Sequence, residues 1–180
     1  MTTRRQFLTN SAIALGGVSL LTATGISLLP SQENPPSFQA TMQQLTELAN
    51  TPLISTGQWQ PATIFAHCAQ SIALSIEGYP SHKPDWFKQS LGKTAFAIFN
   101  QRHAMTHNLA EPIPGAQQLT AMTTQAALQQ LIDQLQRFEN HTGPLAPHFA
   151  YGPLSKAAYR NAHLMHIQDH LQEIQRQAAE

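Results

Sequence analysis

The sequence has little charge and almost no cysteine. Charged side chains make up only 11% of its 180 residues, and ten basic residues balance ten acidic ones. Without a basic surplus the chain has little with which to neutralise a run of phosphates, which argues against a nucleic-acid partner. The single cysteine, Cys68, excludes an intramolecular disulfide and a cysteine-based zinc site. A metal site in this chain would therefore use nitrogen and oxygen ligands.

Several well-defined catalytic sequence motifs are also missing. The sequence contains no glycine-rich phosphate loop, no serine nucleophile elbow and no paired-carboxylate motif. It does contain nine histidines and 21 glutamines, and 42% of its residues are hydrophobic. That apolar fraction is sufficient for the core of one domain of this size, and glutamine supplies a polar surface without charge. The histidines are therefore the main candidates for chemistry.

The first thirty residues have the pattern of an export signal. Arg4 and Arg5 are followed by a polar residue and then by Phe7 and Leu8, the order found in a twin-arginine (Tat) signal. The apolar stretch behind them is diluted by glycine and threonine, which is atypical of a Sec signal or a transmembrane helix. We expect residues 1–30 to be a twin-arginine signal or anchor that the twin-arginine translocase recognises. The protein would then be periplasmic or anchored at the outer face of the inner membrane, with cleavage and retention of the signal both open.

The rest of the chain is predicted to be helical. Residues 31–37 contain two prolines and are expected to form a linker, and residues 38–180 a single all-α domain. Apolar spacings of three and four residues, with capping signals, predict helices over 38–50, 61–77, 85–100 and 124–140, and a last helix from Ser155 to the C-terminus. Prolines and glycine predict an irregular loop over 101–119. No window alternates with period two, so no strand is predicted.

Two histidines of the last predicted helix are spaced so that both reach one metal ion. His166 and His170 are four residues apart, which places them about 40° apart around the helix axis and one turn apart along it. A complete site needs a further ligand, and His67, in an apolar helical setting, is the strongest candidate. From spacing alone two alternatives stay open: His67 as a hydrogen-bonded core residue, and a chance pair in a histidine-rich chain.

Four motifs, in order, resemble those of a known family. They are IFAHCAQSI with the preceding Trp59, PIPG at 112–115, HFAYGPLS at 148–155 and HLMHIQDHLQ at 163–172. Together they are similar to the DinB/YfiT-like metal-binding superfamily, in the branch catalogued as domain-of-unknown-function family 1569. The resemblance spans roughly residues 38–175.

The resemblance implies a fold and a ligand set. The implied fold is a DinB-like four-helix bundle with an extra helix and an irregular loop between helices 2 and 3. The implied ligands are one histidine of the second helix and two of the last, which here are His67, His166 and His170. Two positions depart from the family: Asp169 stands where a histidine often precedes the last ligand, and Tyr159 stands where tryptophan is usual.

The remaining reactive side chains have less specific expectations. His148 is a candidate to support a ligand by hydrogen bonding or to contact a substrate, with stabilisation of its own loop as the open alternative, and His163 is a candidate to line the same pocket. We expect His103 and His107 to lie at the edge of a pocket, and His82 and His141 to face solvent. Asp169 is expected on the helix surface or as a hydrogen-bonding partner, and Cys68 as a buried, unreactive thiol.

These observations predict a divalent-metal-dependent protein, with zinc, nickel or iron (Zn, Ni or Fe) as candidates. Three imidazoles leave coordination positions open for a water or a substrate oxygen. We expect an enzyme acting on an unknown small-molecule substrate: metal-assisted hydrolysis needs only a bound water, and thiol-dependent transfer is what the resemblance to the superfamily implies. The alternative is a non-catalytic metal- or ligand-binding bundle on the periplasmic side, and a bundle with an idle site is a third reading. The membrane is expected as a partner only through the N-terminal segment, and a homodimer stays open.

Overall fold

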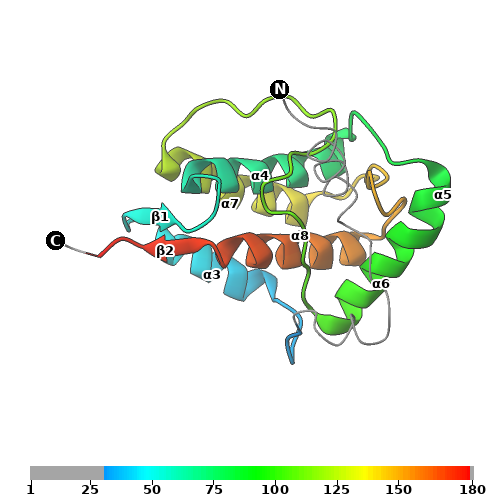
Figure 1. Ribbon diagram of the computed structural model, residues 1–180, viewed down its shortest axis with the longest axis horizontal. Coiled ribbons are helices and arrows are strands. Elements are labelled where there is room, and N and C mark those ends of the chain that lie inside the picture. The colour runs from blue at the N-terminus through cyan, green and yellow to red at the C-terminus, as the bar shows by residue number, and fades with distance from the viewer. Residues whose placement is uncertain (1–30, 179–180) are drawn as a thin grey trace, which may run out of the picture.

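Helices dominate the computed structural model, which describes residues 31–178 (Figure 1). The expected helical class is confirmed at this coarse level. The helices are α3 (Phe38–Leu48), α4 (Pro61–Glu77), α5 (Asp85–Phe87), the π-helical η1 (Lys88–Gly92), α6 (Lys93–Arg102), α7 (Thr124–Asn140) and α8 (Lys156–Leu171). The predicted signal at residues 1–30 lies outside the described residues.

Local sequence explains where the long helices begin. The hydroxyl oxygens of Ser37, Thr123 and Ser155 each accept a hydrogen bond from the backbone N–H three residues on, and so cap α3, α7 and α8. Helix α4 begins with Pro61, whose missing N–H costs nothing in a first turn. It ends at Gly78, whose φ of 104° is strained for any residue with a Cβ.

Helices α3, α4, α7 and α8 share one hydrophobic core. Its most deeply buried side chains include Leu45 of α3, Phe65 and Ile72 of α4, Leu128, Leu131 and Leu135 of α7, and Tyr159, Leu164 and Ile167 of α8. Each fully buried side chain of this size contributes about 1.5–3 kcal/mol by leaving water. The core therefore holds α4 and α8, which carry three of the candidate ligands, in a fixed relation to each other.

The prediction that the chain forms no strand is wrong. Strands β1 (Leu53–Ser55) and β2 (Ile174–Arg176) form an antiparallel pair, with Ile54 opposite Gln175. The last helix consequently ends at Leu171 instead of continuing to the C-terminus. Three residues are too few for period-two alternation to be recognised, and the pairing joins segments that are far apart in sequence. The strand pair ties the segment before α4 to the end of α8.

The stretch between α4 and α7 is peripheral. Helices α5, η1 and α6 follow one another along one side of the molecule, and residues 103–123 return to α7 without helix or strand (Figure 1). The expectations of an additional helix and of an irregular loop here are both confirmed. Gly92 is required by close packing, because a Cβ at this position would collide with the carbonyl oxygen of Ala150.

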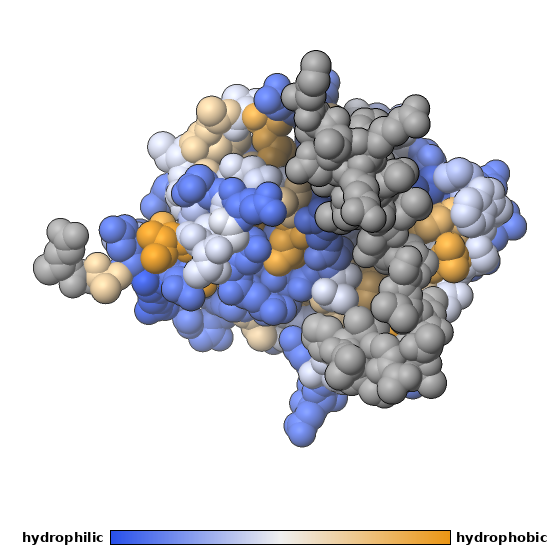
Figure 2. All heavy atoms as spheres, viewed as in Figure 1, coloured by the Kyte–Doolittle hydropathy of each residue, from blue (hydrophilic) through white to orange (hydrophobic). Residues whose placement is uncertain are grey.

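Polar side chains cover most of the described surface in view, with hydrophobic residues in small separate groups (Figure 2). This pattern agrees with a sequence that is polar without being highly charged. Within residues 31–178, no helix has the combined length and apolarity needed to cross a lipid bilayer.

Candidate metal centre

Four histidines from three parts of the chain converge at one point. His67 comes from α4, His166 and His170 from α8, and His107 from the loop after α6; one nitrogen of each lies within 4.8 Å of one nitrogen of every other. The Nε2 atoms of His67 and His166 are 3.3 Å apart, a distance at which one ring can also donate a hydrogen bond to the other. Two nitrogens bound tetrahedrally to zinc at its usual bond length are about 3.3–3.4 Å apart. The spacing therefore fits ligands of a single ion.

Helix geometry explains how the rings meet. His166 and His170 lie on one face of α8, and their ring centroids are 4.8 Å apart. His67 faces them from α4, with its ring centroid 5.1 Å from each of the other two. The structure brings these three histidines together from two helices that share one core.

His170 has an unsatisfied environment that a metal ion would explain. Its exposed fraction is 0%, and neither of its ring nitrogens has a hydrogen-bond partner within the described part of the chain. A neutral imidazole carries one donor and one acceptor nitrogen, and burying either without a partner costs about 1–3 kcal/mol. An ion bound at one nitrogen would remove that cost at the site where three other imidazoles converge.

Burial keeps these imidazoles neutral. It lowers the pKa of His67 to about 4, with a smaller contribution from nearby His107. It also lowers the pKa of His166 well below its usual value and that of His170 to about 2, and the neighbouring histidines act in the same direction. A metal ligand must have its lone pair free of a proton. The three helix-borne histidines are thus in the ligating form at neutral pH.

His107 is held by an acidic partner. Its Nδ1 lies 2.8 Å from Oδ2 of Asp169, whose side chain is only 7% exposed. Because a carboxylate accepts, Nδ1 carries the proton and Nε2 retains its lone pair. A carboxylate on the outer nitrogen is the usual support for a histidine that binds a metal. Of the two roles expected for Asp169, the structure therefore shows the hydrogen-bonding one, in which Asp169 orients the fourth imidazole.

Sequence reasoning assigned His107 only to a pocket edge. Its position in an irregular loop gives no periodicity from which its direction could be read. The available signal was indirect: Asp169 interrupts the histidine-rich motif on α8, and a buried carboxylate needs a hydrogen-bonding partner.

Trp59 forms one wall of the centre. Its ring is nearly parallel to that of His170, with an interplanar angle of 7° and centroids 6.2 Å apart, and it meets the edge of His67 at 5.0 Å. Trp59 belongs to the segment between β1 and α4, which the strand pair fixes against the end of α8. An indole at this place limits the access of water to His67 and His170.

His148 is anchored in the loop before α8. It is 8% exposed, and its Nδ1 accepts hydrogen bonds from the backbone N–H groups of Ala150 and Tyr151. Its ring lies parallel to that of Tyr151, with centroids 4.3 Å apart. Burial lowers its pKa to about 3. Among residues 31–178, the four-histidine cluster does not include His148.

His163 is a buried residue between aromatic rings. It is 3% exposed, with ring centroids 4.9 Å from Phe138 and 5.4 Å from Tyr159. Burial lowers its pKa to about 3. Within the described residues it too lies outside the four-histidine cluster, although it precedes His166 by less than one helical turn.

The remaining groups also lie apart from the cluster. His82 is exposed and its ring approaches Tyr79, while the Nε2 of His141 lies 3.2 Å from the carbonyl oxygen of Pro144. Cys68 is buried, and burial raises the pKa of its thiol, which makes it unreactive.

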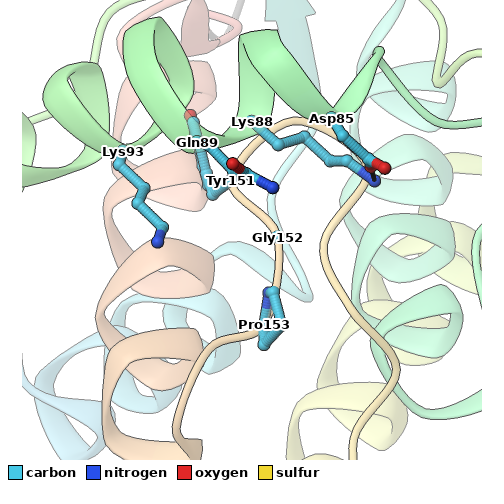
Figure 3. A pocket seen from close by; sticks show the side chains of 7 residues that line it. All are labelled: Asp85, Lys88, Gln89, Lys93, Tyr151, Gly152 and Pro153. Carbon is cyan, nitrogen blue, oxygen red and sulfur yellow. Dashed lines mark ion pairs between the residues drawn. The ribbon is translucent and has the colours of Figure 1, made fainter.

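A surface pocket of about 360 Å³ lies elsewhere, beside α5 and η1 (Figure 3). The ammonium group of Lys88 forms an ion pair of 2.9 Å with Asp85 there. Lys93 and Tyr151 also line it. This pocket lacks the converging imidazoles of the metal centre.

Comparison with known protein families gives a match that covers nearly all of the described residues. A family described as "Protein of unknown function (DUF1569)" matches residues 33–177. The searches of curated proteins and of solved structures found no match. The family match spans the shared core, the strand pair and all four histidines of the metal centre. The chain therefore belongs to the DUF1569 family.

Proposed function

We propose that this protein binds one divalent metal ion through His67, His107, His166 and His170 and uses it in catalysis. The main evidence is that one nitrogen from each of these four imidazoles lies within 4.8 Å of one nitrogen of every other. One of the four, His170, is buried and has no hydrogen-bond partner in the described part of the chain. Neutral imidazoles suit zinc, nickel and iron alike.

The chemistry follows from what such an ion supplies. A bound divalent metal polarises a substrate oxygen, lowers the pKa of a bound water or holds a thiol as thiolate. The chain's own residues contribute positioning and shielding: Asp169 orients His107, and Trp59 restricts water at His67 and His170. Metal-assisted hydrolysis or thiol-dependent transfer of a small molecule is the activity we propose. The resemblance to DinB-like bundles supports this reading, as does the core shared by α3, α4, α7 and α8.

One observation favours the non-catalytic alternative. Four protein ligands can complete the tetrahedral coordination of a metal ion, and sites without an open coordination position are usually structural. The alternative is a metal- or ligand-binding bundle, and it predicts that the loaded protein excludes external ligands.

A substrate screen under the preferred metal separates the two. The chain would be loaded with Zn²⁺, Ni²⁺ or Fe²⁺ and assayed with panels of hydrolase substrates and of thiol-transfer substrates. We expect turnover that disappears in His166→Ala and persists in His82→Ala, an exposed histidine outside the cluster. A fully loaded protein that turns over neither panel would favour the binding alternative.

We further propose export by the twin-arginine route, on the pattern of Arg4, Arg5, Phe7 and Leu8. That route carries folded proteins, which suits a chain that loads its metal before export. Replacing both arginines by lysine in the full-length protein should retain it in the cytoplasmic fraction. Unchanged periplasmic or membrane-attached protein in that variant would contradict the proposal.

A further inference from the structure

The four histidines of the metal centre are not equivalent. His67, His166 and His170 project from α4 and α8, which the core holds together, whereas His107 projects from the irregular stretch 103–123. His107 is exposed as a residue, whereas His67 and His170 are buried and His166 is half-buried. Three ligands are therefore fixed by the fold, and one is not.

The backbone around His107 forms a short tip between two anchors. Met105 and Ile113 are each 6% exposed and hold the two sides of the tip, while Thr106 and Asn108 next to His107 are exposed. At the start of the loop His103 adopts a left-handed conformation with φ of 53°, which is uncommon for a residue with a Cβ. We expect so exposed a tip to shift at a lower cost than the packed helices.

One contact sets the position of the His107 ring. Asp169 lies on α8, is 7% exposed and is 2.8 Å from Nδ1 of His107. Because α8 fixes the position of the carboxylate, the same hydrogen bond forms again whenever a displaced His107 ring comes back. When the ring leaves, the carboxylate loses its partner, and this cost holds the open form to a minor population.

We propose that His107 is an exchangeable fourth ligand, and that a small anionic donor such as a thiolate, a carboxylate or hydroxide takes its coordination position. This inference rests on the proposed metal binding and names where and how an external ligand reaches that site. In the exchange the Nε2 lone pair of His107 leaves, a lone pair of the anion arrives, and the Nδ1 proton stays on the ring. Asp169 acts as the positioning residue that sets how often His107 is in place.

Charge selects the class of ligand. Four neutral imidazoles leave the two positive charges of a divalent ion uncompensated, and Asp169 supplies one negative charge nearby. An anion that replaces a neutral imidazole therefore gains electrostatic attraction in a site of low solvent access.

The test uses the full chain loaded with Co²⁺, whose visible spectrum reports its coordination, and azide as the probe anion. We expect His107→Ala to bind azide at least about tenfold more tightly than wild type, because wild-type protein binds only in the fraction of time that His107 is displaced. Free imidazole should restore the wild-type spectrum of His107→Ala. His82→Ala, the matched control, should match wild type throughout.

Substitutions at Asp169 test the positioning role. Asp169→Ala should tighten azide binding in the same direction as His107→Ala, whereas Asp169→Asn keeps an oxygen that accepts from Nδ1 and should stay closer to wild type. Equal azide affinity in wild type and His107→Ala would overturn the inference while leaving the metal site intact. A wild-type chain that takes up no Co²⁺ would overturn the proposed function itself, and the exchange with it.

Discussion

Two regions of the molecule bury histidines, and they do so in opposite ways. At the junction of α4 and α8, imidazole nitrogens face one another, and those of His170 have no hydrogen-bond partner within the described residues. In the loop before α8, His148 is enclosed by aromatic rings and accepts two backbone N–H groups. Burial lowers the pKa values in both regions. A low pKa therefore does not distinguish a histidine of a metal centre from a structural histidine. What distinguishes them is whether the ring nitrogens face other imidazoles or the backbone of their own loop.

The largest expected difference between the regions is in metal-linked stability. A metal present at a thousand times its dissociation constant stabilises the folded state by about 4 kcal/mol. For a chain of this size each kcal/mol is about 2–4 °C of melting temperature. Chelation should therefore lower the melting temperature of wild-type protein by about 8–16 °C, measured by calorimetry. The His67→Ala, His166→Ala, His170→Ala variant should show no such shift, and an unchanged wild-type transition would contradict a shared ion.

Removing His148 should destabilise the fold and leave the metal in place. His148→Ala loses a buried stacked ring and leaves two backbone N–H groups without their acceptor, so we expect a loss of about 3 kcal/mol in the free energy of unfolding. Urea denaturation would measure this loss, and elemental analysis the metal content. His148→Asn offers an oxygen in place of Nδ1 and should lose less. A His148→Ala protein without metal would show that His148 does support the site.

The smallest effect is the pH dependence of the metal-free protein. The pKa of His148 is about 3 when folded, against about 6.5 when unfolded. Between these values the unfolded chain binds a proton that the folded chain does not, so stability is lost as pH falls, by about 1.4 kcal/mol per pH unit. Between pH 6.5 and 5 wild type should lose about 1.6 kcal/mol more than His148→Asn in denaturant titrations, because the unfolded histidine is only half protonated at the upper pH. Parallel losses in the two proteins would place the titration elsewhere.

The helical class and the shared face of His166 and His170 could be predicted because both follow from local periodicity, whereas His67 was joined to them by the resemblance to a known family. Pro61 and Gly78 mark the two ends of α4, apolar spacing indicates α7, and Ser155 marks the start of α8. The four-residue interval between His166 and His170 fixes their common face on any helix.

The strand pair and the role of His107 could not be predicted, because both depend on contacts distant in sequence. The partner of Leu53 is Arg176, and the partner of His107 is Asp169. Loop residues such as His107 have no period from which a direction follows. For His148 the sequence leaves a supporting role and a loop-stabilising role open, and in the structure its Nδ1 accepts hydrogen bonds from its own loop.

The central claim, that four converging histidines hold one metal ion, is tested most directly by the metal content of the folded, signal-free protein. Elemental mass spectrometry would be applied to wild type, to the His67→Ala, His166→Ala, His170→Ala variant and to His148→Asn. We predict close to one divalent ion per chain in wild type and in His148→Asn, and almost none in the triple variant. A wild-type protein that is empty and does not load with added Zn²⁺, Ni²⁺ or Fe²⁺ would contradict the account.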